Sequence, residues 1–129
     1  MRMADIAWEQ MSMGDKSAAE STIAEGLKDN EKHRWGSDQV NGWMMLAEAL
    51  ASMGEYDRAL QVARKIEYAP IRARTLELVA YHETEAGHQD WAISWAQEIE
   101  DPEGQARTFL GIADALVEQV PGEGQDINE

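Results

Sequence analysis

A repeat with an offset of 33 residues (79 − 46) is the clearest structural signal in this chain. It is seen when residues 46–76, LAEALASMGEYDRALQVARKIEYAPIRARTL, are aligned with residues 79–109, VAYHETEAGHQDWAISWAQEIEDPEGQARTF. Most of the identical positions carry small or apolar residues, as the positions of a shared scaffold would. The ten identical pairs are Ala47/Ala80, Gly54/Gly87, Asp57/Asp90, Ala59/Ala92, Ala63/Ala96, Ile66/Ile99, Glu67/Glu100, Ala73/Ala106, Arg74/Arg107 and Thr75/Thr108.

A weaker copy of the same unit precedes these two. Ile6–Ala7 lie as far before Gly14 as Leu46–Ala47 lie before Gly54, so this copy is offset by 40 residues (54 − 14). We assign the additional seven or so residues to the polar segment 28–39, since surface loops tolerate such insertions. We therefore predict a long loop over residues 28–39.

Each copy has the apolar spacing of a helical hairpin. Leu46, Leu50 and Met53 recur at helical steps, and Gly54 suits the left-handed turn that ends a helix. Asp101–Pro102 reads as a helix cap followed by a first-turn proline. No stretch alternates as a strand would, so the sequence predicts an all-α fold. The expected helices cover about 2–13, 16–28, 38–53, 56–67, 70–86, 89–100 and 102–119.

Composition indicates one small domain. The chain has 129 residues, 43% of them hydrophobic, and no cysteine, which excludes disulfides, thiolate nucleophiles and cysteine-ligated metals. Its net charge of −14 opposes binding to nucleic acid or to an anionic membrane. No apolar run is long enough to span a bilayer and the first residues lack an apolar signal core, so we expect a cytoplasmic protein. We expect a domain over residues 1–120 and an acidic flexible tail over 121–129.

The repeat unit resembles the tetratricopeptide repeat (TPR). Trp43-Met-Met-Leu46-Ala47 is similar to the first-helix signature of that family, the segment GEYDRAL at 54–60 is similar to its turn, and Pro70 stands near its proline. The resemblance covers residues 2–119 and implies a right-handed α–α superhelix, or solenoid, of about three and a half hairpins. The chain departs from the family at Glu83, where an aromatic residue is usual, and its repeat is one residue shorter. A related helical-hairpin repeat is the alternative.

In such an array the first helix of each hairpin lines a concave binding face. By the family pattern, this face carries Trp8, Met11, Asn41, Met44, Glu48, Arg74, Glu77, Tyr81, Arg107, Leu110 and Asp114. Arg74 and Arg107 recur at one register and could clamp a carboxylate of a bound peptide. The alternative is that they form salt bridges between repeats. The small residues Ala47, Ala80 and Ala113 are expected to let neighbouring helices approach closely.

Tryptophans form a second candidate surface. Trp91 and Trp95 are spaced i, i+4 and occupy the repeat positions of Arg58 and Val62, so at least Trp91 should be exposed. They indicate either a contact surface, with homodimerisation as its simplest form, or packing on the adjacent terminal helix. The Met-rich run 43–45 suits an adaptable surface but matches a core position of the family. Trp35, in the polar insertion, is either an anchor for the loop or a contact for a partner.

No catalytic or metal motif emerges. His82 and His88 are too far apart for a His-Glu-x-x-His site, and Gly87 breaks the helix between them. We therefore expect no metal, no cofactor and no enzymatic activity, although a small helical enzyme and an acidic mimic of nucleic acid remain alternatives. The leading hypothesis is a module that binds a protein or peptide partner on its concave face. The second is a structural subunit or assembly factor held in a larger complex through the tryptophans.

Overall fold

The computed structural model describes residues 3–12, 14–31 and 37–119 of the chain. These residues form seven helices, and none of them lies in a strand. The expected tail over 121–129 and Trp35 lie outside the described residues. The helices are α1 (Met3–Ser12), α2 (Lys16–Glu31), α3 (Ser37–Ser52), α4 (Tyr56–Arg64), α5 (Ala69–Glu85), α6 (Gln89–Gln97) and α7 (Pro102–Gln119).

The predicted helices are confirmed, with three corrections at their ends. α2 continues to Glu31, so the segment predicted as a loop over 28–39 begins and ends in helix. α4 and α6 each end about three residues earlier than predicted. Both close with a tighter turn, in which the amides of Lys65 and Glu98 bond to carbonyls three residues back, Val62 and Trp95.

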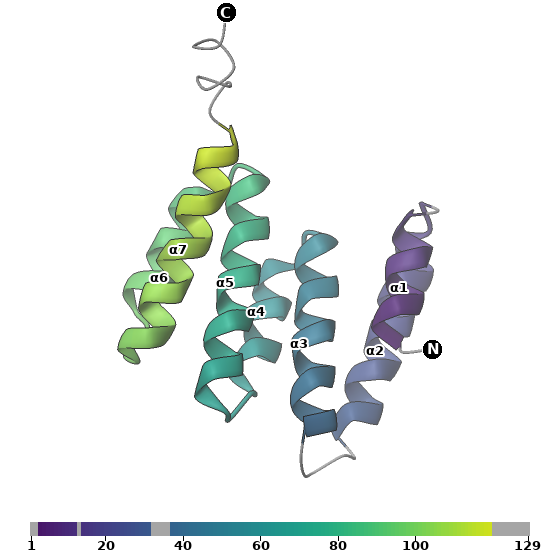
Figure 1. The fold of residues 1–129 in the computed structure, drawn as a ribbon. Helices are drawn as coiled ribbons and strands as arrows, with labels where there is room; N and C mark the ends of the chain where they lie inside the picture. The colour runs from purple at the N-terminus through teal and green to yellow at the C-terminus, as the bar shows by residue number, and fades with distance from the viewer. Residues whose placement is uncertain (1–2, 13, 32–36, 120–129) are drawn as a thin grey trace, which may run out of the picture.

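The helices form two layers. Figure 1 shows α1, α3, α5 and α7 side by side in one layer and α2, α4 and α6 behind them. Among the described helices, each contacts only those one or two positions away along the chain. The first helix of every pair therefore contacts both its own partner and the first helices of the neighbouring pairs.

The same glycine turn ends α1, α3 and α5. Gly14, Gly54 and Gly87 have φ values of 82°, 84° and 94°, a region that residues with a Cβ rarely adopt. In each turn the following amide bonds to the carbonyl five residues earlier, from residue 15 to 10, 55 to 50 and 88 to 83. This bond satisfies carbonyls that a helix end would leave unpaired, so the turn is a C-terminal capping motif that recurs in all three pairs.

Alanine makes the core between the two layers close-packed. Ala7, Ala47 and Ala80 are fully buried at one repeat register, and Ala59 and Ala92 are fully buried at another. Larger side chains fill the spaces between them, and Trp43 is among these with 5% of its surface exposed. The core interpretation of Trp43 is therefore correct, and the ammonium of Lys65 lies 5.2 Å from the centre of its ring.

The expectation for Ala113 is wrong. Ala113 is exposed, because α7 is the last described helix and no described helix covers its outer side. The close approach of α7 to α5 occurs instead at Gly111, where a Cβ atom would overlap the backbone carbonyl of Glu77. Thr75 and Thr108 are also fully buried at their shared register, and each hydroxyl donates to the carbonyl four residues back at 2.7 Å.

The start of α7 follows the predicted cap. The carboxylate of Asp101 accepts the amide of Gly104 at 3.0 Å, directly ahead of the first-turn proline. The side chain of Gln105 then donates to the carbonyl of Ala96 at 3.1 Å and so closes the end of α6. Arg72, one repeat earlier, donates to the carbonyl of Ile66 at 2.9 Å beyond the end of α4.

Candidate interaction surfaces

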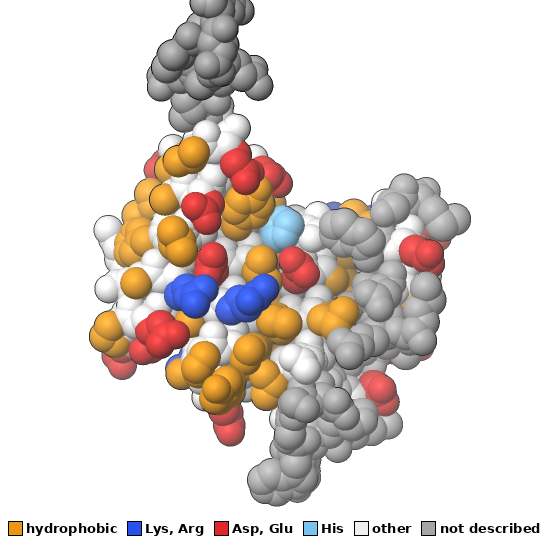
Figure 2. Space-filling view, viewed as in Figure 1, with side chains coloured by type: hydrophobic (Ala, Val, Ile, Leu, Met, Phe, Trp, Pro, Cys, Tyr) orange, Lys and Arg blue, Asp and Glu red, His pale blue; other side chains and the backbone are white. Residues whose placement is uncertain are grey.

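The first candidate surface is the exposed side of the first-helix layer, which we call the front face and which includes Asn41, Met44, Arg74, Glu77, Tyr81, Arg107 and Leu110. Figure 2 views this side and shows two basic patches next to each other over α5 and α7, with acidic and hydrophobic side chains around them. Arg74 and Arg107 are both exposed there, one repeat apart on adjacent helices. The repeated register thus brings the two guanidinium groups onto one side of the molecule.

Polar contacts tie α5 to α7 across the front face. Arg107 forms an ion pair with Glu77 at 3.1 Å, as the salt-bridge alternative predicted for this arginine. The Tyr81 hydroxyl donates to the carboxylate of Glu118, and this bond raises the pKa of the tyrosine well above its ordinary value. No carboxylate in the described part of the chain forms an ion pair with Arg74.

The remaining front-face predictions fall on α1 and α3. Asn41 and Met44 are half-buried on α3. Trp8 belongs to α1, and its side chain lies outside the described residues. The front face is therefore most open over α5 and α7, where Leu110 also keeps 48% of its surface exposed.

The two tryptophans of α6 have different environments. Trp91 is 65% exposed, and its indole stacks on the imidazole of His88 with ring centres 5.3 Å apart and planes 17° from parallel. Trp95 is 9% exposed, and its indole N–H donates to the carboxylate of Glu83 at 2.8 Å. The predicted exposure of Trp91 is confirmed, whereas Trp95 is a core side chain and not part of an exposed pair.

A hollow of about 440 Å³ separates α4 from α6, and we call it the tryptophan hollow. Glu83, from α5 beneath, lines it although only 2% of the residue is exposed. Burial raises the pKa of Glu83; Asp57 acts in the same direction, while the bond from Trp95 and the nearby His88 oppose it. The residues that line the hollow are Asp57, Leu60, Arg64, Glu83, Trp91, Ser94, Trp95 and Glu98.

Sequence reasoning did not identify Glu83 as a site residue, although it noted the departure from the family pattern at this position. The signal was the repeat itself, because Glu83 aligns with Leu50 and Leu116 at the 33-residue offset. Sequence reasoning also missed Val117, which is 70% exposed on α7. Its register equivalent on α5, Thr84, faces α7 and its carbonyl accepts a hydrogen bond from the side chain of Gln119.

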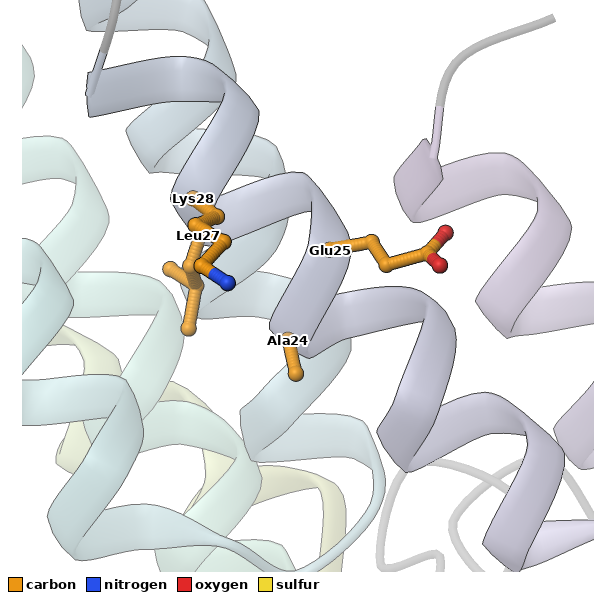
Figure 3. Close-up of a pocket in the computed structure, with 4 residues that line it drawn as sticks. All are labelled: Ala24, Glu25, Leu27 and Lys28. Atoms are coloured by element: carbon orange, nitrogen blue, oxygen red, sulfur yellow. The ribbon is translucent and has the colours of Figure 1, made fainter.

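A second hollow, of about 350 Å³, lies beside α2 and offers little chemistry. Its described lining comes from α2 alone and consists of Ala24, Glu25, Leu27 and Lys28. Figure 3 shows the carboxylate of Glu25 directed away from Leu27 and Lys28. A single helix that turns its acidic and basic groups apart does not make a convergent site.

The described residues contain no group of three or more histidine, aspartate or glutamate side chains arranged to hold a metal ion. In the same part of the chain, no helix combines the length and the apolar character needed to cross a membrane. Comparisons with known protein families, with curated proteins and with solved structures found no match to this chain.

Proposed function

We propose that this protein is a non-catalytic, TPR-like interaction module that binds a peptide or a partner helix along the front face. A solenoid of helical hairpins is supported by three helix pairs, in each of which the same glycine turn ends the first helix, and by α7 after them. In a solenoid the scaffold positions repeat, while the exposed positions are free to differ and so to select a partner.

The observation that carries this proposal is the pair of exposed arginines at one repeat register. Arg74 has no ion pair among the described residues, and the Arg107–Glu77 pair is solvent-exposed, with 48% of the arginine side chain accessible. Exposed ion pairs stabilise a fold by only about 0–1 kcal/mol, so a partner carboxylate can displace Glu77 at little cost. Both guanidinium groups are thus available to an acidic or C-terminal carboxylate, beside the apolar contact that Leu110 offers.

The test begins with capture of the partner at a defined position. A photo-crosslinking amino acid in place of Leu110 should capture a protein from a lysate of the source cells, and the same group in place of Ala24 on the opposite layer should not. The affinity of the captured protein is then measured for the parent chain, for the Arg74→Glu/Arg107→Glu variant and for Lys16→Glu.

Charge reversal of the two arginines should weaken binding about tenfold or more, since hydrogen bonds to charged groups contribute about 1.5–3 kcal/mol each. Lys16→Glu, an exposed change on α2, should leave affinity unchanged, and circular dichroism should show equal helix content in all three proteins. Equal affinity for the parent and the double variant would remove the arginine clamp from the proposal.

A second candidate function is a subunit or assembly factor held in a larger complex, or in a homodimer, through α6. The 65% exposure of Trp91 favours it, because exposed tryptophans are enriched at binding hot spots. Trp91→Ala should then reduce the assembly size measured by light scattering without loss of helix content. An unchanged assembly would leave the front-face module as the better candidate.

A further inference from the structure

In the tryptophan hollow, a pair of residues that includes a carboxylate stands where the preceding repeat has two apolar residues. At the equivalent place one repeat earlier stand Leu50, fully buried, and Val62, 4% exposed. In the hollow their positions are taken by Glu83 and Trp95, joined by a 2.8 Å hydrogen bond. A leucine and a valine at these positions would give a more stable core, because an uncompensated buried carboxylate is destabilising.

The carboxylate of Glu83 is only partly satisfied. Its described donor is the Trp95 indole N–H, which bonds to Oε1. A carboxylate can accept about four hydrogen bonds, so Glu83 retains capacity for a further donor. That donor can come from the solvent side, because the residue lines a hollow of about 440 Å³ that is open between α4 and α6.

The walls of the hollow favour a cation. Asp57 on α4 and Glu98, directly after α6, add two carboxylates to Glu83, whereas Arg64 is the one basic residue among the described residues of the lining. Trp91 adds an indole whose orientation is held by its stack on His88 and which remains 65% exposed. Three carboxylates and an accessible indole in one lining match a planar cation, which stacks on an aromatic face and donates at its edges.

We propose that the tryptophan hollow binds the guanidinium group of an arginine side chain presented by a protein partner. The guanidinium lies against Trp91 and donates to Glu83 and to one of the two rim carboxylates, Asp57 and Glu98. Arginine fits better than lysine, because its fixed fork of donors reaches two carboxylates at once while its plane stacks on the ring.

Arg64 is the internal competitor for this site. It belongs to α4 and lines the hollow, but no ion pair within 4.0 Å joins it to the three carboxylates of the lining. The chain's own guanidinium is thus near the site without filling it, and its charge opposes the entry of a second cation. Removal of that charge should therefore improve binding of an external arginine.

The test uses two small probes of matched shape. N-acetyl-arginine amide carries one guanidinium, and N-acetyl-citrulline amide replaces it with an uncharged urea group. Titration is followed by ¹H–¹⁵N NMR through the indole N–H signals of Trp91 and Trp95, each assigned with a Trp→Phe variant. The arginine probe should shift both signals and saturate with a dissociation constant of the order of millimolar, as a single side chain allows. The citrulline probe should bind at least tenfold more weakly.

Three variants distinguish the hollow from a general charge effect. Glu83→Gln keeps the acceptor for Trp95 and should weaken the arginine probe about tenfold. Glu85→Gln removes one negative charge from the same helix outside the hollow and should change nothing. Arg64→Gln should tighten binding severalfold.

Equal shifts with both probes, or unaltered affinity in a folded Glu83→Gln protein, would overturn the proposal. The hollow lies on the side of α4 and α6, away from the front face, and no natural partner is needed for the titration. Its result is therefore independent of whether the arginines of the front face bind a partner.

Discussion

At the scale of single residues, the most informative side chain is Glu83. It stands at an apolar position of the repeat, is 2% exposed, and accepts one hydrogen bond from Trp95. Burial raises its pKa, so the folded protein holds this proton more tightly than the unfolded chain does. The carboxylate thus opposes folding at neutral pH, and the tryptophan hollow retains a group that the fold itself would not select.

The pH dependence of stability should show this directly. Because the pKa of Glu83 is raised in the folded state, its contribution to the free energy of unfolding decreases as the pH rises from the ordinary glutamate pKa of about 4.3 through the folded-state pKa. Above the folded-state pKa this contribution is constant. Glu83→Gln cannot lose a proton and still accepts from Trp95, so its melting temperature relative to the parent should rise between pH 4 and pH 7.

Melting curves of both proteins at several pH values check this, with Glu85→Gln as the exposed control. Subtraction of the parent removes the contribution of the other carboxylates. A constant difference across that range would show that Glu83 has the same pKa in the folded and unfolded states.

At the scale of helices, identical repeat positions have different surroundings. Ala80 on α5 is fully buried, whereas its equivalent on α7, Ala113, is exposed. The two positions have the same residue and the same place in the helix, and differ only in whether another helix lies against them. The close contact between α5 and α7 occurs instead at Gly111.

The same substitution should therefore affect stability very differently at these two alanines. Ala80→Leu places three additional carbon atoms against a close-packed neighbour and should destabilise the protein by about 1–3 kcal/mol or more. Ala113→Leu adds the same atoms on an open surface and should change stability by less than about 0.5 kcal/mol. Denaturant unfolding of both variants measures the difference. Equal losses would indicate that something covers α7 in solution.

At the scale of the whole molecule, contacts between the described helices run only between near neighbours along the chain. No described helix from the first pair contacts α5, α6 or α7. In such an arrangement stability is approximately a sum of local contributions, so one end can open while the other stays folded.

A buried charge in the first hairpin should unfold that hairpin alone. Ala19 on α2 is fully buried, and Ala19→Glu should cost several kcal/mol because the carboxylate has no partner there. Hydrogen exchange should then accelerate in α1 and α2 but remain slow in α5 and α7. Ala24→Glu, an exposed change on the same helix, is the control. Equal acceleration in all seven helices would show a single cooperative unit.

Local chemistry was sufficient to predict the helices. Apolar spacing, the glycines at 54 and 87, and the Asp101 cap each act within one or two turns of chain, and the structure has helices and turns at those places. The exposure of Trp91 also followed from the repeat register. The ends of α4 and α6 were less predictable, because a final tight turn competes closely with one more turn of helix.

Contacts between helices determined the side-chain partners and the burial that the repeat register alone could not predict. The indole N–H of Trp95 finds its acceptor on another helix, in Glu83, twelve residues earlier. Ala113 is exposed because burial of this residue would require a further helix against α7, and none of the described helices lies there. Repeat positions are equivalent in sequence but not in surroundings, since burial and charge pairing belong to the contacts between helices rather than to any one helix.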